Sequence, residues 1–391
     1  MRIVLFTNEY AHNKLPPTGG LGTFYKRLAE GLIKNGIEVH VLLISKRSMN
    51  FSIEGIQFEV VKSYAKSFPV KELMRSLGNR LGLSQSNKRF LISERIFWSN
   101  TLNSYVQKHG IDLVESFVYD GYTAYYSCPV PLVLRFHGSR KFWHYKLQQP
   151  QNAAYFEMEQ LALESCTSLV ANSIYTKNIL TELYHLNASV LIYNGLDTSF
   201  FKPEKEVQRI SKSIFYFGTL SASKGLMELV RIVNKVHQTH PDMSLHLIGR
   251  GKAYFDKKIK KSLSSSLLEQ TTFYAEQDLS DLPRILSSAD LILLPSRGET
   301  FGYTIVEAMS LEKTTIIPNI PVAQELIDHQ KNGYIFDSEK HCVELINELF
   351  CNPEITTDIG KEARQKVVSK FSIDQMIRKS IELYNTLLND K

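Results

Sequence analysis

The sequence predicts an α/β protein made of two doubly wound domains, each a parallel sheet covered by helices. Three observations predict it: short apolar runs alternate with helical patterns, the alternation restarts halfway, and 391 residues exceed one ordinary core. An apolar content of 43% is ordinary for a globular protein. We expect an N-terminal domain over 1–195 and a C-terminal domain over 196–371, with a final helix at 372–391 packing back on the first.

The first half reads as strands separated by helices. Ile3–Thr7 is the first expected strand, and Thr23–Lys34 is a helix because its apolar residues recur at helical spacing. Asn35-Gly36 ends that helix. Strands in this alternation pair in parallel through right-handed crossovers. Further strands are expected at Glu38–Ile44, Gly55–Val61, Asp112–Phe117, Pro131–Phe136, Leu169–Asn172 and Ser189–Tyr193.

The second half repeats this pattern after a junction near Asn194–Pro203. Its last segment, Phe371–Leu388, has the apolar periodicity of a helix. Helices are also expected at Leu226–Gln238, Leu279–Ser288 and Thr304–Ser310, and strands at Ile214–Phe217, Ser244–Ile248, Thr271–Tyr274, Leu291–Leu294, Thr314–Ile317 and Gly333–Phe336.

The charge of the chain is unevenly spread. Residues 1–150 hold 20 Lys and Arg against 10 Asp and Glu, whereas the remainder holds 26 against 30. Segment 62–95 has eight basic and two acidic residues with apolar residues between them. It predicts contact with an anionic membrane surface or, equally, a solvated basic face. Four scattered cysteines and the lack of a spanning or signal segment predict a cytoplasmic protein.

Two of the patches that follow predicted strands lie in the first half, at the positions where doubly wound sheets bind ligands. The glycine run Gly19-Gly20-Leu21-Gly22 allows a close backbone approach, and the helix after it favours an anion. It does not match the spacing of an NAD-type site, and a plain surface loop is an equal interpretation. His137-Gly138 offers a histidine that can hydrogen-bond a hydroxyl or stabilise developing charge, although a lone histidine is more often structural.

Two further patches lie in the second half. In the loop 218–225, Lys224 offers a point charge to a phosphate or is an ordinary surface lysine. Pro295–Ser310 follows an apolar run and carries Glu299 before a glycine-containing turn and Glu307 after it. Strand, turn and helix present backbone N–H groups to an anion. We expect the two carboxylates to hold two ends of one extended anionic ligand.

In this order the patches resemble glycosyltransferase family four, the glycosyl transferases group 1, which are retaining enzymes of the GT-B fold. The resemblance covers nearly the whole chain and implies two Rossmann-like domains facing a central cleft. Its most specific part is Glu299 to Glu307, which is similar to the family's E-x7-E motif. Supporting matches are the glycine run, His137-Gly138, Asn172-Ser173 with Lys177, Asn194-Gly195-Leu196-Asp197 and Lys224-Gly225.

The resemblance implies a hexosyltransferase that moves a sugar from a nucleotide-sugar donor to a saccharide or lipid-linked acceptor, in the synthesis of cell-surface polysaccharide or glycoconjugate. His137 and Glu299 are the implied catalytic residues. Glu307 would hold the ribose and Lys224 the diphosphate. The implied donor-binding residues are Gly19, Gly20, Gly22, Thr219, Lys224, Arg250, Phe301, Gly302, Tyr303, Thr304 and Glu307.

No Asp-x-Asp occurs in the sequence, so we expect a metal-independent reaction without a cofactor and without a nucleic-acid partner. Thr219 stands where the family commonly has an arginine, and Arg250 is a candidate replacement for that cation. This departure motivates a second hypothesis, a non-catalytic subunit that binds a nucleotide. A nucleotide-sugar epimerase on the same fold is a third. Segment 62–95 favours a position on the inner face of the membrane.

Overall fold

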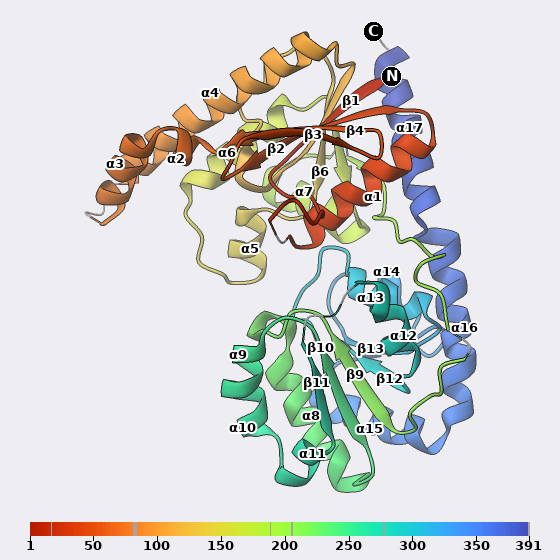
Figure 1. The fold of residues 1–391 in the computed structure, drawn as a ribbon. Coiled ribbons are helices and arrows are strands. Elements are labelled where there is room, and N and C mark those ends of the chain that lie inside the picture. The colour runs from red at the N-terminus through yellow and green to blue at the C-terminus, as the bar shows by residue number, and fades with distance from the viewer. Residues whose placement is uncertain are drawn as a thin grey trace. The chain divides into compact units, whose positions relative to one another are not determined.

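The structure is a computed structural model that describes residues 1–16, 18–80, 84–187, 189–204, 206–275, 277 and 279–389. The chain divides into two compact units, each with its own sheet (Figure 1). Unit 1 comprises Met1–Gly195 and Ile373–Lys391, and unit 2 comprises Leu196–Ser372. The resemblance implies that the N-terminal domain meets the acceptor and that the C-terminal domain binds the nucleotide sugar, and both roles stay predictions.

Unit 1 is built on an eight-stranded sheet in the order β3-β4-β2-β1-β5-β6-β7-β8. β3 pairs antiparallel with β4, and the other pairs are parallel. The sequence does not predict β3, because this mostly exposed edge strand lacks an apolar run. The strands are β1 (Arg2–Thr7), β2 (Glu38–Ser45), β3 (Met49–Ile53), β4 (Ile56–Lys62), β5 (Leu113–Phe117), β6 (Leu132–Phe136), β7 (Ser168–Ala171) and β8 (Ser189–Leu191).

The sheet of unit 1 has an apolar core on each face. Ile3 and Leu5 of β1 join the core that α1 (Gly20–Lys34) and α17 (Ile373–Asn389) help to form, whereas Val4 and Phe6 join the core that contains Trp98 of α4. This alternation follows from the two-residue period of a strand. Helices therefore cover both faces, as a doubly wound sheet requires. The other helices are α2 (Tyr64–Ser67), α3 (Pro69–Arg80), α4 (Ser84–His109), η1 (Tyr119–Gly121), α5 (Arg140–Lys146), α6 (Ala154–Ser165) and α7 (Ile174–Tyr184).

The C-terminal helix α17 is fastened to the sheet of unit 1 by a buried polar network. Arg135 Nε donates to Glu115 Oε1 at 2.6 Å, and Arg135 Nη2 donates to Ser380 Oγ at 2.7 Å. The hydroxyl of Tyr384 donates to the other carboxylate oxygen of Glu115. All four side chains are buried, so each charge depends on these partners. The network joins β5 and β6 to a helix more than 200 residues later in the chain.

Unit 2 is built on a six-stranded parallel sheet in the order β11-β10-β9-β12-β13-β14. Its apolar strands are buried on both faces, which is typical of a parallel sheet. The strands are β9 (Ser213–Phe217), β10 (Ser244–Ile248), β11 (Thr271–Tyr274), β12 (Leu291–Leu293), β13 (Thr314–Pro318) and β14 (Tyr334–Phe336).

The three helices predicted in unit 2 are present, one of them divided, and the structure adds helices that were not predicted, of which α15 and α16 are the longest. The stretch predicted as one helix over Leu279–Ser288 is a 3-10 turn followed by α12, because Pro283 favours the first turn of a new helix. Within the described part of the chain, no helix is both long enough and apolar enough to cross a membrane. The helices are η2 (Ala222–Lys224), α8 (Leu226–Thr239), α9 (Lys252–Tyr254), η3 (Phe255–Ile259), α10 (Lys260–Ser262), α11 (Ser265–Glu269), η4 (Leu279–Asp281), α12 (Leu282–Ser287), α13 (Tyr303–Ser310), α14 (Ala323–Leu326), α15 (Glu339–Cys351) and α16 (Pro353–Lys370).

Candidate functional site

The carboxyl ends of β10, β9 and β12 are neighbours in the sheet of unit 2. β10 pairs with β9 on one side and β12 pairs with it on the other, so the strand order reverses at β9. Ligands of doubly wound folds bind beyond the carboxyl ends of the strands at such a switch point. The loop after β9 carries Thr219 and Lys224, and the loop after β10 carries Arg250. The loop after β12 carries Glu299 and leads into the helix that carries Glu307.

Glycines allow these loops to approach one another closely. Gly225 has a φ of 71°, and a Cβ at this position would lie 1.7 Å from the carbonyl oxygen of Pro295. Gly249 has a φ of 133°, and a Cβ there would lie 2.1 Å from the carbonyl oxygen of Gly218. Both the positive φ and the lack of space require glycine. A larger residue at either position would push the loops apart.

Glu299 is held by two hydrogen bonds in the loop between β12 and α13. Its Oε1 accepts from Lys224 Nζ at 2.5 Å and from Ser296 Oγ at 2.7 Å. The side chain of Glu299 is 15% exposed and that of Lys224 is 38% exposed. Hydrogen bonds between charged groups fix the orientation of both partners. Lys224 is therefore not an isolated surface lysine, because it contacts the carboxylate predicted to be catalytic.

The helix α13 begins directly after this loop. Its N-cap, Gly302, has a φ of 89°, and a Cβ there would come within 2.9 Å of Ile305 Cδ1. Tyr303 and Thr304 form its start, one residue earlier than predicted, and buried Phe301 precedes them. The first N–H groups of a helix have no partner inside it and carry a partial positive charge. The start of α13 therefore favours an anion beside the Lys224 loop.

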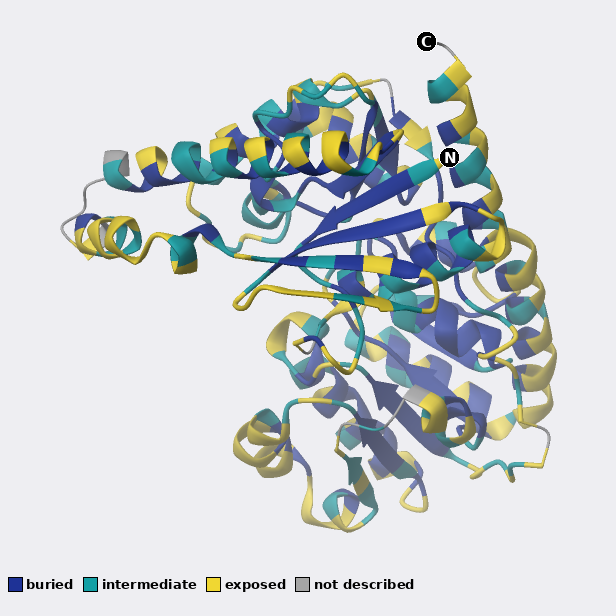
Figure 2. Cartoon of the chain, turned by 45° about the horizontal axis from the view of Figure 1, so that its top comes forward, coloured by how far each residue is buried: buried dark blue, intermediate teal, exposed yellow. Residues whose placement is uncertain are grey.

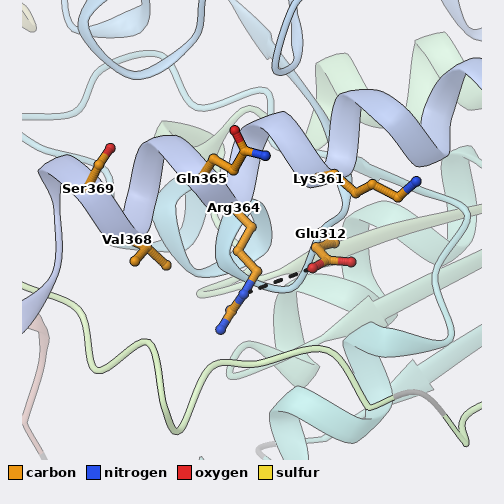
Figure 3. A pocket seen from close by; sticks show the side chains of 6 residues that line it. All are labelled: Glu312, Lys361, Arg364, Gln365, Val368 and Ser369. Carbon is orange, nitrogen blue, oxygen red and sulfur yellow. Dashed lines mark ion pairs between the residues drawn. The ribbon is translucent and has the colours of Figure 1, made fainter.

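Glu307 lies in the second turn of α13 and is 9% exposed. The far end of this helix is fixed by Arg364 of α16, whose Nη1 donates to the carbonyl oxygens of Ser310 at 2.5 Å and Phe201 at 3.0 Å. A cation at the C-terminus of a helix is stabilising, because it interacts favourably with the negative end of the helix dipole. Figure 3 shows Arg364 beside Glu312 in a surface cavity of about 470 Å³. Arg364 thus positions the helix that carries Glu307.

Thr219 and Arg250 lie in adjacent loops and are both exposed. The backbone N–H of Leu220 donates to the carbonyl oxygen of Arg250 at 2.7 Å. The hydroxyl of Tyr216, which the sequence analysis did not single out, donates to the carbonyl oxygen of Thr219 at 2.9 Å. The backbone of Arg250 therefore lies beside the loop that carries Thr219.

Two further residues of the loop after β12, Ser296 and Arg297, contact this site, although no motif had indicated them. Arg297 Nε donates to Glu228 Oε1 at 3.0 Å, and the backbone N–H of Arg297 donates to the carbonyl oxygen of Ser223 at 3.2 Å. These contacts join the loop after β12 to the loop after β9 and to the first turn of α8. Ser296 lies only three residues before Glu299, and this short spacing could have indicated their hydrogen bond. The sequence has no comparable signal for the contacts of Arg297.

The glycine run in unit 1 is the start of a helix, which corrects the prediction of a glycine-rich loop before Thr23. α1 begins at Gly20 because Glu9 supplies an anion to its N-terminus: Glu9 Oε2 accepts from the N–H of Gly19 at 3.1 Å and from Thr18 Oγ1 at 2.6 Å. A Cβ on Gly22 would lie 2.0 Å from Thr18 Oγ1, whereas no described atom lies within 4 Å of one on Gly20. Gly20 thus has the open surroundings that a close ligand approach needs.

His137 lies at the carboxyl end of β6 and is half-buried. Its ring lies 4.4 Å from the ring of Phe24. Burial and the positive charge of Arg135 lower the pKa of His137 to about 3. The imidazole is therefore neutral near pH 7. It can donate or accept a hydrogen bond, but it does not offer a full positive charge to a developing anion, as the sequence analysis had allowed.

Comparison with known protein families gives two adjoining matches. Residues 18–200 match the family described as "Glycosyltransferase Family 4", and residues 197–366 match "Glycosyl transferases group 1". The second match contains the loops after β9, β10 and β12, and the first contains the glycine run and His137.

Similar proteins were found over most or all of the chain. An uncharacterized glycosyltransferase of Methanocaldococcus jannaschii is 24% identical, with 98% of each chain covered. The GDP-mannose:cellobiosyl-diphosphopolyprenol alpha-mannosyltransferase of Xanthomonas oryzae is 23% identical over 72% of this chain and 74% of its own length. Among solved structures, sucrose-phosphate synthase from Thermosynechococcus elongatus has a TM-score of 0.80 at 16% identity, with both chains fully covered. Anabaena Alr3699/HepE in complex with UDP has a TM-score of 0.72 at 17% identity, covering 99% of this chain and 100% of that one.

Proposed function

Because the chain belongs to glycosyltransferase family four and has the GT-B fold, as its motifs predicted, we propose that it is a retaining hexosyltransferase. A sugar passes from a nucleoside diphosphate to a saccharide or lipid-linked acceptor, and its anomeric configuration is kept. The observation that carries this proposal is the contact between Lys224 and Glu299 beside the start of α13. It joins a cation for a leaving diphosphate and a carboxylate for sugar hydroxyls in one loop cluster.

In the proposed reaction the bond between the anomeric carbon and the β-phosphate oxygen breaks, while the acceptor oxygen bonds to the same face of that carbon. The leaving phosphate oxygen takes the proton of the acceptor hydroxyl. Negative charge grows on the diphosphate, where Lys224 and the N–H groups at the start of α13 stabilise it. Lys224 Nζ has three N–H donors, so it can hold a phosphate oxygen and keep its hydrogen bond to Glu299.

The remaining residues have proposed roles that follow from their chemistry. Glu299, oriented by Ser296, accepts hydrogen bonds from hydroxyls of the transferred sugar, and buried Glu307 accepts them from the ribose. Neutral His137 exchanges a hydrogen bond with the transferred sugar. Arg250 supplies the second diphosphate cation in place of an arginine at position 219.

We further propose that the reaction needs no metal ion, because Lys224, Arg250 and a helix N-terminus supply the positive charge that a bridging metal would provide. Transfer activity is then expected to be unchanged after dialysis against EDTA. A loss of activity that Mg²⁺ or Mn²⁺ restores would contradict this part of the proposal.

The acceptor is proposed to be a lipid-linked saccharide of cell-surface polysaccharide synthesis, met on the cytoplasmic face of a membrane. The support is the mannosyltransferase of Xanthomonas oryzae, whose name gives a diphosphopolyprenol acceptor. The basic balance of residues 1–150 also favours an anionic acceptor. The similar proteins suggest two donor bases, uridine from the Anabaena complex and guanosine from that mannosyltransferase.

The test begins with thermal denaturation of the protein in the presence of UDP-, GDP-, ADP- and TDP-sugars. One nucleotide class is expected to raise the midpoint, since a ligand that binds only the folded state stabilises it. The stabilising donor is then offered with candidate acceptors, and the anomeric configuration of the product is read by proton NMR. An inverted product would overturn the retaining mechanism.

A second function, a nucleotide-binding subunit without transfer activity, is favoured by exposed Thr219 in place of the arginine. It predicts a thermal shift with a nucleotide and neither hydrolysis nor transfer with a broad panel of acceptors. The third hypothesis, an epimerase, predicts that the donor is converted when every acceptor is left out. The same two assays therefore separate the three functions.

A further inference from the structure

One face of α3 carries four large apolar side chains that are exposed. They recur at the helical spacing i, i+3, i+4 and i+7, and their exposed fractions are 68% for Val70, 60% for Leu73, 66% for Met74 and 48% for Leu77. We call these four residues the α3 stripe. Figure 2 shows α3 largely exposed at one end of unit 1, beyond the sheet. A continuous exposed apolar face marks a surface that contacts a partner or a membrane.

The opposite face of α3 is anchored to α4, so the stripe is displayed by a held helix. Arg75 Nη1 donates to Asn87 Oδ1 at 3.3 Å, and the guanidinium of Arg75 lies 5.2 Å from the ring centre of Phe90. Ser86 Oγ donates to the carbonyl oxygen of Met74 at 3.3 Å. These contacts hold α3 against α4, and the four apolar side chains of the stripe remain exposed to solvent.

The surroundings of the stripe are basic. From Tyr64 to Arg80 the chain has four basic residues and one acidic residue, Glu72, which forms an ion pair with Arg75. Lys66, Lys71 and Arg80 are exposed, as are Lys88 and Arg89 at the start of α4. Two copies of this surface would place like charges against each other, which disfavours self-association. The charge pattern instead fits an anionic surface.

The sheet topology places α3 at a functional edge of unit 1. The parallel pairs of β4, β2, β1, β5 and β6 put the carboxyl ends of these strands at one edge. α2 and α3 follow the end of β4, and His137 follows the end of β6. A membrane that contacts α3 therefore lies at the same edge of the sheet as His137.

Within segment 62–95, which was predicted to contact a membrane, α3 is the helix whose apolar face is exposed. Phe90 and Leu91, which the same apolar pattern included, are buried against the rest of unit 1 and unavailable to lipid. Leu81 and Leu83 lie outside the described residues. The aromatic side chains Tyr64 and Phe68, with ring centres 4.7 Å apart, support the turn into α3.

We propose that α3 docks unit 1 on a bilayer that contains anionic phospholipid, with the α3 stripe entering the interfacial layer and the surrounding basic side chains contacting headgroup phosphates. The proposal rests on the proposed function for the identity of the membrane-linked acceptor, but the docking itself does not require transfer activity.

The test is co-sedimentation of the full chain with vesicles of phosphatidylcholine, with and without phosphatidylglycerol, at low and high NaCl. Binding is expected with the anionic vesicles only, and it is expected to weaken as salt screens the basic side chains. The double variant Leu73→Gln/Met74→Gln should bind roughly tenfold more weakly, since two apolar side chains no longer favour insertion. The matched control Val368→Gln/Ile355→Gln, whose residues are 44% and 38% exposed on α16, should bind like the unmodified protein.

A second readout reports insertion directly. Met74→Trp is expected to show a blue shift of tryptophan emission with anionic vesicles, which Val368→Trp does not show. If the unmodified protein fails to bind anionic vesicles, the proposal is overturned. It is also overturned if the stripe variant binds normally, which would leave a purely electrostatic contact, or if the stripe instead drives concentration-dependent dimers in sedimentation velocity.

The two proposals fail separately. Thermal shifts with nucleotide sugars should be the same for the stripe variant and the unmodified protein, because the stripe lies outside the donor-binding loops. If the protein binds a donor but no vesicles, only the docking proposal is wrong. If it binds vesicles but no donor, the proposed function is wrong and the docking proposal is unaffected.

Discussion

The contact between Lys224 and Glu299 makes a prediction that can be tested in detail with single and double variants. Glu299→Gln removes the negative charge of the carboxylate whose Oε1 accepts hydrogen bonds from Lys224 Nζ at 2.5 Å and Ser296 Oγ at 2.7 Å. A hydrogen bond to a charged group contributes about 1.5–3 kcal/mol, so kcat/KM should fall roughly 10- to 150-fold. Lys224→Met removes a cation from the developing diphosphate charge and should lower kcat/KM roughly 100- to 1,000-fold.

The effect on stability should be much smaller than the effect on rate. The Lys224 side chain is 38% exposed, and solvent screening limits a pair of this kind to about 0.5–1 kcal/mol of unfolding free energy. Urea denaturation measures this term separately from kcat/KM. The control is Lys340→Met/Glu344→Gln, an exposed pair of α15 with atoms 3.8 Å apart, which should leave kcat/KM unchanged.

The double variant Lys224→Met/Glu299→Gln decides whether the two residues act together. Residues in contact usually show coupling of about 0.5–3 kcal/mol, so the double variant should lose less than the product of the two single losses. Full activity of Glu299→Gln with every donor would refute the role given to this carboxylate. Losses that multiply without coupling would refute a functional role for the contact.

Three further predictions concern the framework of each unit. Tyr384→Phe removes the hydroxyl that donates to the buried Glu115 carboxylate, so urea denaturation should show a loss of about 1.5–3 kcal/mol; an unchanged midpoint would contradict the network. The folded pKa of His137, about 3, lies below its unfolded value of about 6.5, so the unfolded chain binds the proton first. The stability that this residue contributes is present above pH 6.5 or so and is lost as pH falls towards 3, and His137→Gln should flatten that limb of the pH–stability curve. Arg364→Leu should lower the unfolding free energy by about 1–3 kcal/mol and weaken donor binding in a thermal-shift titration, because α13 loses its anchor; unchanged donor affinity would show that this anchor does not position Glu307.

Much of the fold could be predicted because the parallel strands are buried on both faces and therefore read as apolar runs. The strand Ser244–Ile248, which is buried along most of its length, has the predicted bounds. β3 was not predicted, since this exposed edge strand has no apolar run; its signal is the alternation of Met49, Phe51 and Ile53 with polar residues. α1 begins earlier than predicted because Glu9 accepts from the N–H of Gly19. The apolar periodicity of a sequence cannot predict this contact, since the two residues are ten positions apart and outside the helix.

The candidate site was less predictable than the fold, because its contacts join residues far apart in the sequence. The pattern placed Lys224 and Glu299 after two different strands, but only the strand order makes those loops neighbours. The same limit applies to segment 62–95. Leu73 and Leu91 have the same apolar pattern around them in the sequence, yet Leu73 is 60% exposed and Leu91 is 1% exposed. The difference arises because Leu91 of α4 packs against the rest of unit 1, whereas the outer face of α3 contacts solvent.

Each unit already holds an acidic side chain where the sequence predicts an anionic ligand. Glu9 accepts from the N–H of Gly19 at the start of α1, and Glu299 accepts from Lys224 beside the start of α13. The Glu299 carboxylate keeps Lys224 in position, but like-charge repulsion would also weaken the binding of a diphosphate to that lysine. An arginine at position 219 would offset that repulsion, and in the proposed reaction Arg250, whose loop is hydrogen-bonded to the loop of Thr219, takes this role. Donor affinity should therefore depend more strongly on Arg250 in this chain than in relatives that have an arginine at position 219.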